Sequence, residues 1–244
     1  MDEQPLLDKT VLITGAARRV GRILALGCAQ AGADVIVHYG HSAEEAAQTQ
    51  DEIEALGRHA WVLASDLSQP AEASHTTSRA NEISPLYALI NSAAIFEPLS
   101  LAETTLSDWE RHLSINLTAP FLLSQAFAEQ LSEGAKGRIV NILDWRALRP
   151  RADHFPYTVS KAGLAALTQS LAVALAPRIT VNGLALGAAL PPADGGAGSD
   201  LIKDVPLGRW SEANEVQQAL VFLLASPSYV TGEIIHVDGG RHLI

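Results

Sequence analysis

Short apolar runs and longer amphipathic stretches alternate along the whole chain. Apolar runs bounded by polar residues are typical of buried parallel strands, and we expect strands at Thr10–Thr14, Asp34–Tyr39, Ala60–Ala64, Leu86–Ile90, Gly137–Leu143, Ile179–Leu184 and Ile234–Val237. Helical spacing of apolar residues predicts helices at Arg22–Ala31, Ser42–Leu56, Ser107–Gln130, Ala162–Ala176 and Ser211–Ala225. This alternation predicts an α/β fold, a doubly wound parallel sheet of about seven strands with helices on both faces. We expect a single domain over residues 1–244.

The composition agrees with a large globular domain and limits the kinds of partner. The 244 residues are 48% hydrophobic, and the net charge of −10 disfavours non-specific binding to nucleic acid. The single cysteine, Cys28, excludes an internal disulfide and a cysteine-rich metal site, and we expect no metal. Met1–Lys9 is short and acidic, unlike a signal peptide, and no apolar run reaches the roughly 18 residues that span a bilayer. We therefore expect a soluble cytoplasmic protein that binds a small molecule.

The first strand, helix and second strand form a βαβ unit whose turn suits a dinucleotide. Backbone N–H groups of such a turn, together with the helix N-terminus, can bind a pyrophosphate. Arg19 stands where the usual three-glycine pattern has its middle glycine, so the pattern is incomplete. The turn residues that we expect to contact the cofactor are Gly15, Arg18, Arg19, Val20 and Gly21.

The end of the second strand indicates which cofactor binds. An NAD site usually has an acidic residue here to bind the ribose hydroxyls, and this chain has none. Instead, His38, Tyr39, His41 and Ser42 offer hydrogen-bond donors, and the two arginines of the turn should approach the same ribose. This set favours a 2′-phosphate, and therefore NADP(H). Alternatively, the histidine and the tyrosine simply end the strand.

Residues after the third and fourth strands complete the predicted cofactor site. Asp66 and Leu67 follow the third strand, and Asp66 would contact the adenine, cap the next helix, or do both. The fourth strand is followed by Asn91, Ser92 and Ala93, whose size would let the cofactor lie close to the strand. Ligands bind at the carboxyl ends of strands in sheets of this kind.

A tyrosine and a lysine four residues apart carry the candidate chemistry. Tyr157 and Lys161 would share one helix face, and the lysine cation would lower the pKa of the phenol, making it an acid–base group. Asp144, at the end of the fifth strand, would raise that pKa again or relay a proton. Alternatively, Asp144 forms a structural salt bridge with Arg146 or Arg149.

Three further features leave alternatives open. Asn116 lies inside a helical stretch at a cost in propensity, so it either has a structural role or faces the site. The segment Ala188–Gly198 is rich in proline and glycine, and it forms either a lid over the substrate or a disordered surface loop. Arg146, Arg149 and Arg151 form a basic run that either meets an acidic group of the substrate or is simply solvated.

Together these motifs resemble the short-chain dehydrogenase/reductase family over nearly the whole chain. The resemblance rests on Thr14-Gly15…Gly21, Asp66, Asn91-Ser-Ala-Ala94, Asn116, Tyr157-x-x-x-Lys161 and Asp238-Gly-Gly240, in order and at family-like spacing. It implies a Rossmann-type fold, a nicotinamide cofactor and Tyr157 as the proton donor. It also implies that Lys161 holds the nicotinamide ribose, that Asn116 positions Lys161 through a water, and that the protein is a homotetramer with Arg241 near a neighbour's active site.

Departures from the family pattern resemble its pteridine reductase branch, which includes the bacterial dihydromonapterin and dihydrofolate reductases. Asp144 replaces the usual serine, Arg19 replaces the middle glycine of the turn, and the second strand ends in His38-Tyr39-Gly40-His41-Ser42. Phe96 also matches the branch's aromatic residue that holds a pterin against the nicotinamide. The expected substrate contacts are therefore Arg19, Phe96, Asp144 and Tyr157. Other positions differ from the branch: His41 replaces an arginine, Ser92 an asparagine, Ala94 a serine, and Leu186-Gly187 the usual Pro-Gly, with Gly187 still expected at the cofactor.

The sequence thus predicts an NADPH-dependent reductase of a pterin-type substrate. One alternative is a reductase of the same fold acting on another carbonyl, such as a 3-oxoacyl thioester, a sugar or another ketone. Asp144 argues against it, because a serine hydroxyl usually bonds the carbonyl at that position. The other alternative is a non-catalytic NADP-binding protein, against which the intact Tyr157, Lys161 and Asn116 argue. Phe96 could also serve only in packing.

Overall fold

The computed structural model describes residues 4–190, 202–225 and 229–244. Within these residues, seven strands form one parallel sheet in the order β3-β2-β1-β4-β5-β6-β7. The strands are β1 (Thr10–Ile13), β2 (Asp34–Tyr39), β3 (Ala60–Ala64), β4 (Leu86–Asn91), β5 (Gly137–Asp144), β6 (Ile179–Leu186) and β7 (Ile234–Val237). The predicted doubly wound, Rossmann-type sheet is confirmed, and every expected strand is present.

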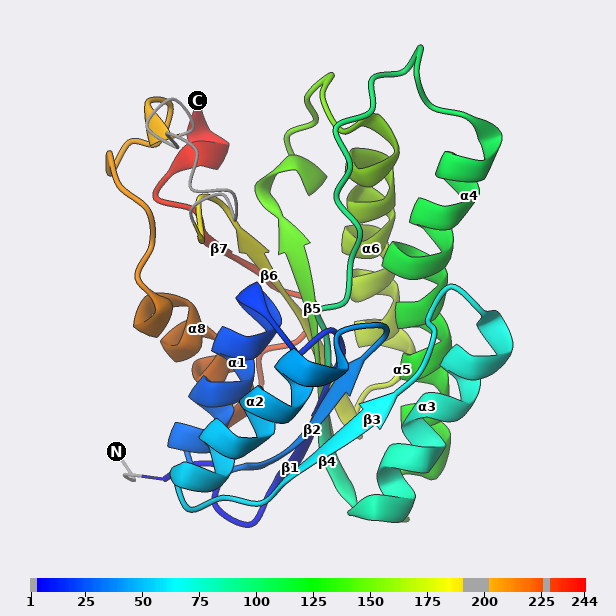
Figure 1. Ribbon diagram of the computed structural model, residues 1–244, viewed down its shortest axis with the longest axis vertical. Coiled ribbons are helices and arrows are strands. Elements are labelled where there is room, and N and C mark those ends of the chain that lie inside the picture. Colours follow the sequence, from blue (N-terminus) through cyan, green and yellow to red (C-terminus); the bar gives the residue numbers. More distant parts are fainter. Residues whose placement is uncertain (1–3, 191–201, 226–228) are drawn as a thin grey trace.

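Helices cover both faces of the sheet (Figure 1). The main helices are α1 (Arg19–Gln30), α2 (Ala43–Ala55), α3 (Pro70–Ile83), α4 (Leu106–Leu113), α5 (Ala119–Gln130), α6 (Phe155–Ala174) and α8 (Ala213–Ala225). Helices α1, α2 and α8 lie on one face, and α3, α5 and α6 on the other. Successive residues of β1 point to opposite faces, so Val11 and Ile13 pack under α1 and α8 while Leu12 packs under α3 and α5. Burying each of these side chains contributes about 1.5–3 kcal/mol.

The strand order places a ligand crevice between β1 and β4. The chain moves outward from β1 to β3 and then crosses back to β4, so the loops after β1 and β4 diverge at their carboxyl ends. Thr14 joins these two loops, because its Oγ1 accepts hydrogen bonds from Ser92 N at 2.9 Å and from Ala93 N at 3.0 Å. These bonds tie the two loops together at the base of the crevice.

The stretch Ser107–Gln130, expected as one helix, is interrupted. Helix α4 begins at a capping box between Thr105 and Asp108, and a π-helical turn, Ser114–Thr118, separates α4 from α5. The wider turn carries Asn116, which is fully buried. Single π-turns often occur at functional sites, and the polar side chain on this turn bonds to Ile95 in the loop after β4 and to Ser160 on α6.

The sequence indicated only the start of α3, and the structure gives a reason. The buried residues of this helix are Ala73, Thr76, Thr77 and Ala80, which are small or polar, so its apolar periodicity is weak. None of the described helices combines the length and apolar character needed to cross a membrane. The possible lid at Ala188–Gly198 lies largely outside the described residues.

Candidate active site

A cavity of about 490 Å³ runs along the carboxyl ends of β1 to β4. It is partly open to solvent and follows the crevice described above. Its lining includes most residues expected at the cofactor: Gly15, Arg18, Arg19, Val20, Gly21, His38, Tyr39, His41, Ser42, Asp66, Leu67, Ser92 and Ala93. The structure therefore brings four separate loops together into one elongated site.

The turn after β1 needs glycine at two positions. Gly15 has φ of +65°, and a Cβ there would lie 2.8 Å from Ala93 Cα. A Cβ on Gly21 would lie 2.1 Å from the carbonyl oxygen of Gly15. Bare backbone thus faces the cavity at the N-terminus of α1, which fits a pyrophosphate. Arg19, which stands where the usual pattern has its middle glycine, has a left-handed backbone with φ of +51°, which costs about 1–3 kcal/mol.

His38 holds the backbone of this turn in place with its two ring nitrogens. Its Nδ1 accepts a hydrogen bond from Gly15 N at 3.1 Å, and its Nε2 donates to the carbonyl oxygen of Ser65 at 3.1 Å. Burial lowers the pKa of His38 to about 4, so the ring is neutral. Both ring nitrogens are therefore occupied by backbone, and the polar groups that remain for a ribose phosphate belong to the turn arginines, Tyr39, His41 and Ser42.

Two predicted cofactor residues have other hydrogen-bonding roles. Asp66 Oδ1 accepts from Ser68 N at 2.9 Å, and these contacts with Ser68 lower the pKa of the carboxyl. The N-cap of α3 is Gln69, so the suggestion that Asp66 caps this helix is wrong. Asn91 lines neither this cavity nor the catalytic one described next: it is buried, and its Nδ2 donates to Asn141 Oδ1 at 2.8 Å, tying β4 to β5.

A second cavity, of about 240 Å³, adjoins the first at the end of β5. The two share Arg19, Val20, Ser92, Ala94 and Phe96 as lining residues. The residues that only the second cavity has include Asp144, Tyr157, Lys161 and Gly187. Every residue predicted for catalysis or substrate binding, apart from Asn116, therefore meets in this smaller chamber.

A phenol and a carboxylate form the centre of the chamber. Tyr157 OH donates a hydrogen bond to Asp144 Oδ2 at 3.2 Å. Burial, followed by the charge of Asp144 and this hydrogen bond, raises the pKa of Tyr157 well above its ordinary value. Burial also raises the pKa of Asp144, against the hydrogen bond from Arg146 N. The phenol is thus held in its protonated form, as a proton donor requires.

Lys161 differs from the expectation drawn from its spacing. Its ammonium donates to the carbonyl oxygen of Ile142 at 2.7 Å and lies 5.8 Å from the centre of the Tyr157 ring. Burial lowers the pKa of Lys161 to about 8. The expected lowering of the Tyr157 pKa by this cation is not found, because burial and Asp144 dominate.

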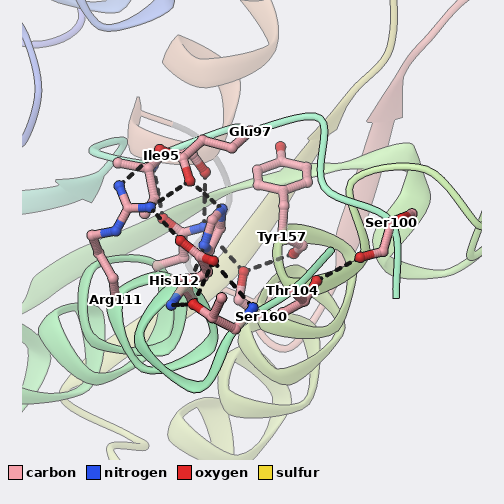
Figure 2. Close-up of polar contacts among 11 residues, drawn as sticks. Ile95, Glu97, Ser100, Thr104, Arg111, His112, Tyr157 and Ser160 are labelled. Atoms are coloured by element: carbon pink, nitrogen blue, oxygen red, sulfur yellow. Dashed lines mark hydrogen bonds and ion pairs between the residues drawn. The ribbon is translucent and has the colours of Figure 1, made fainter. Parts of the chain in front are cut away.

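Asn116 connects the loop after β4 to helix α6, which carries Tyr157 and Ser160 (Figure 2). Its Oδ1 accepts from Ile95 N at 2.9 Å, and its Nδ2 donates to Ile95 O at 3.1 Å and to Ser160 Oγ at 3.0 Å. Ser160 Oγ in turn donates to the carbonyl oxygen of Tyr157 at 2.7 Å. The structural role considered for Asn116 is therefore supported, whereas its side chain lines neither cavity and does not face the site. Its link to Lys161 through a water stays a prediction.

Further contacts hold the same loop from outside. Arg111 donates to both carboxylate oxygens of Glu97, at 2.7 and 2.6 Å, and also to Asp108 at 3.0 Å (Figure 2). His112 is fully buried, and its Nδ1 donates to the carbonyl oxygen of Asp108 at 2.7 Å. Since Glu97 follows Phe96 directly, these bonds fix where the Phe96 side chain emerges.

Phe96 is 51% exposed and stands beside the phenol. Its ring packs edge to face with Tyr157, at 4.7 Å between centroids and 76° between planes. The His154 ring stacks on Phe96 at 3.9 Å and 7°. His154 has φ of +52° and directly precedes α6, but no sequence pattern identified it or Ser160.

Arg146 joins this aromatic group to the carboxylate. Its guanidinium donates to Asp153 at 2.8 Å and lies 3.6 Å from Asp144, so the salt bridge considered as an alternative for Asp144 is present alongside the bond to Tyr157. Asp153 also lies 3.3 Å from the ring of His154. Among the described residues, no group of three or more potential ligand side chains is placed to bind a metal ion.

Comparison with known proteins identifies the family. Residues 15–242 match the family model described as enoyl-(acyl carrier protein) reductase. A 3-oxoacyl-[acyl-carrier-protein] reductase of Synechocystis sp. is 30% identical over 240 residues, covering 96% of this chain and 97% of the relative. The solved structure of FolM alternative dihydrofolate reductase 1 from Brucella canis, complexed with NADP, is 32% identical, with a TM-score of 0.90 and coverage of 98% and 96%. A blue fluorescent protein from a metagenomic library, in complex with NADPH, is 35% identical, with a TM-score of 0.89 and coverage of 98% and 99%.

The similarity extends over almost the entire length of these proteins. The site described above also has the groups that a dehydrogenase or reductase of this kind needs. A glycine turn opens α1, and the tyrosine and lysine lie on α6 beside the end of β5. The chain is therefore an oxidoreductase of the short-chain dehydrogenase/reductase family.

Proposed function

We propose that the protein is an NADPH-dependent reductase of a pterin-type substrate, such as a dihydropterin, dihydromonapterin or dihydrofolate. The observation that carries this proposal is the hydrogen bond from Tyr157 to Asp144 at 3.2 Å, inside a chamber walled by Phe96. During its reduction, a pterin gains a proton on a ring nitrogen when hydride reaches the neighbouring carbon. A neutral phenol can donate that proton, and the neighbouring Asp144 can relay a proton from solvent to the phenolate that is left.

The cofactor would lie in the larger cavity and supply the hydride. The bare backbone around Gly15 and Gly21 would hold its pyrophosphate, and Arg18, His41 and Ser42 its 2′-phosphate. Lys161 would hold the nicotinamide ribose from the smaller chamber. The NADP and NADPH complexes of similar proteins support this choice of cofactor.

Protein groups would handle the proton and orient the substrate. Tyr157 would donate its proton to the substrate nitrogen. Asp144, partly buried at the end of β5, would then relay a proton from solvent to the Tyr157 phenolate. Phe96 offers a half-exposed ring on which a flat pterin can stack, worth on the order of 1 kcal/mol beyond burial. Arg19, which lines both cavities, would bond a substrate carbonyl beside the cofactor phosphates.

A second candidate is reduction of another carbonyl, and the relative named 3-oxoacyl-[acyl-carrier-protein] reductase favours it. In such a reaction negative charge develops on the carbonyl oxygen, which needs hydrogen-bond donors. Asp144 would place a carboxylate there, so the charge of this residue opposes that chemistry.

A homotetrameric assembly and a cytoplasmic location complete the proposal, and light scattering of the purified protein would test the assembly.

Oxidation of NADPH tests the two candidates directly. The substrates would be dihydrobiopterin, dihydrofolate, a 3-oxoacyl thioester and a panel of sugars and other ketones. We expect turnover of a pterin, with Asp144→Ser reducing pterin turnover more than NADPH binding. Fast turnover of a ketone without turnover of any pterin would overturn the proposal.

A further inference from the structure

The carboxylate of Asp144 receives a hydrogen bond on each of its oxygens. Oδ2 accepts from Tyr157 OH at 3.2 Å, and Oδ1 accepts from Arg146 N at 2.8 Å. Both donors are uncharged, so they satisfy the carboxylate oxygens without balancing the negative charge. The Asp144 side chain is only 16% exposed, and an enclosed carboxylate takes up a proton unless a cation compensates it.

The guanidinium of Arg146 supplies a compensating charge. Its Nη1 lies 3.6 Å from Asp144 Oδ1, and the side chain is 13% exposed, so solvent screens this pair weakly. At 3.6 Å the contact acts through charge and is too long for a hydrogen bond. Nη2 donates to Asp153 at 2.8 Å, and Nε is buried with no hydrogen-bond partner among the described residues. The Asp153 side chain is 49% exposed, so solvent screens its charge more strongly than that of Asp144.

Other charges around the pair have weaker effects on Asp144. Burial raises the pKa of Asp144, and the N–H and the charge of Arg146 oppose that rise more than Lys161 or Tyr157 does. Arg146 is therefore the cation on which the ionisation of Asp144 chiefly depends. The remaining ionisable groups that face the pair come from the segment before α6 and from the C-terminal 3₁₀ turn (Arg241–Leu243), and they are Asp153, His154 and Arg241.

We propose that Arg146 is a positioning residue that keeps Asp144 ionised in the resting enzyme, ready to relay a proton from solvent to Tyr157. The inference rests on the proposed function, which makes Tyr157 the proton donor. In that step the Tyr157 O–H bond breaks as the substrate N–H bond forms, which leaves a phenolate. Asp144 then takes a proton from solvent, gives it to the phenolate and is a carboxylate again. Its negative charge also raises the pKa of Tyr157, after burial, and so keeps the phenol protonated between turnovers.

Titration of the Asp144 carboxyl tests this role directly. Protein with carbon-13 in its aspartate carboxyl groups, in complex with NADP, is followed by NMR against pH, and the Asp144 signal is the one missing from Asp144→Asn. An opposite charge this close lowers the pKa of an aspartate by about 1–3, so Arg146→Met should raise the titration midpoint by about 1–3 pH units. Arg146→Lys should restore most of the original midpoint, because the contact acts through charge.

A neighbouring arginine provides the matched control. Arg149 is exposed on the same loop, and its side chain donates to the carbonyl oxygen of His242 at 3.0 Å. Arg149→Met removes the same charge and should leave the Asp144 midpoint in place. Arg146→Gln repeats the test if the methionine variant does not fold. An unchanged midpoint in folded Arg146→Met or Arg146→Gln, or an equal shift in Arg149→Met, would overturn the inference.

The pH profile of kcat carries the test into turnover. With whichever substrate the enzyme prefers, pterin or ketone, kcat should fall as the pH rises through the Asp144 midpoint, since the relay then lacks its proton. Arg146→Met should move this inflection to higher pH by the same amount as the NMR midpoint, and Arg146→Lys should move it back. A uniform loss of kcat at every pH, with the inflection in place, would contradict the inference.

The two measurements separate failure of the inference from failure of the proposed function. The NMR titration needs no turnover, so a midpoint that moves in Arg146→Met and returns in Arg146→Lys supports the role of Arg146 even if no pterin is reduced. Good turnover of a pterin, with a midpoint that Arg146→Met leaves in place, would contradict that role although the proposed function stands.

Discussion

The cofactor crevice and the catalytic chamber share lining residues, but different features of the chain define them. In the crevice, the decisive features are backbone conformations: Gly15 in the left-handed region, and Gly21 packed against a carbonyl. In the chamber, they are buried ionisable side chains, Asp144, Tyr157 and Lys161, whose pKa values are all shifted by burial. The crevice thus depends on the shape of its backbone, whereas the chamber depends on the charge and protonation of its side chains.

This difference predicts that substitutions in the two regions fail in different ways. A change of shape in the crevice should weaken binding of the cofactor and leave the rate of a saturated enzyme largely intact. A change of charge in the chamber should alter the rate and its pH dependence with little effect on cofactor binding, except at Lys161, which would hold the nicotinamide ribose. Kinetic and binding measurements on single variants test whether the two effects are separable.

The largest effect is expected for Tyr157→Phe, which removes the proton donor but keeps the ring. General acid catalysis contributes about 10²–10⁴-fold, so kcat for the preferred substrate should fall by that order. The dissociation constant for NADPH, measured by fluorescence titration, should stay within about twofold of the original. A parallel loss of cofactor affinity would show that the chamber and the crevice are not separable.

Gly15→Ala should produce the opposite result. The new Cβ would lie 2.8 Å from Ala93 Cα on a backbone with φ of +65°, so the turn must shift. We expect NADPH affinity to fall at least about tenfold, roughly 1.4 kcal/mol, with a smaller change in kcat at saturation. Gly57→Ala is the matched control, because Gly57 has φ of +79° but no atom within 4 Å of the added Cβ. It should reduce stability and leave NADPH affinity unchanged.

The pH dependence should follow Lys161. Its pKa of about 8 means that the ammonium is lost as the pH rises through that value, so kcat/KM for NADPH should fall above about pH 8. Lys161→Arg keeps the charge and should move the fall to higher pH. A wild-type profile that stays flat to pH 10 would contradict the assignment.

Unfolding of the protein does not explain such a fall. The pKa of Lys161 is lower in the folded state than its ordinary value of 10.5, so the unfolded chain binds more protons between about pH 8 and pH 10.5. The free energy of unfolding contributed by this lysine therefore rises with pH in that window. Thermal melts recorded at each pH would separate the two effects.

A smaller effect is expected for His154, which supports the Phe96 ring. His154→Ala removes a stack at 3.9 Å, and aromatic pairs contribute about 0.5–1.5 kcal/mol, so KM for a flat substrate should rise roughly two- to tenfold. His154→Phe restores an aromatic ring and should recover most of the affinity, whereas His154→Leu should not. Equal recovery by leucine would show that volume, and not stacking, matters.

Particular residues show how far sequence reasoning reached into the site. Most of the expected cofactor residues line the crevice, because they follow strands whose carboxyl ends must meet at one edge of the sheet. Asn91 is an exception, since its side chain turns to Asn141 on β5. The contacts of His154 and Ser160 were not recognised, because each depends on a partner distant in the chain or on a local backbone that no pattern encodes.

The order of strands and helices, the glycine turn and the tyrosine–lysine spacing could be predicted, because these features follow from periodicity and local stereochemistry. The protonation of the site could not, because it depends on how the chain packs. Spacing predicted that Lys161 would lower the pKa of Tyr157, but burial and the bond to Asp144 raise it. Desolvation and long-range charge depend on which segments enclose a group, and that is settled only when β5 and α6 pack together.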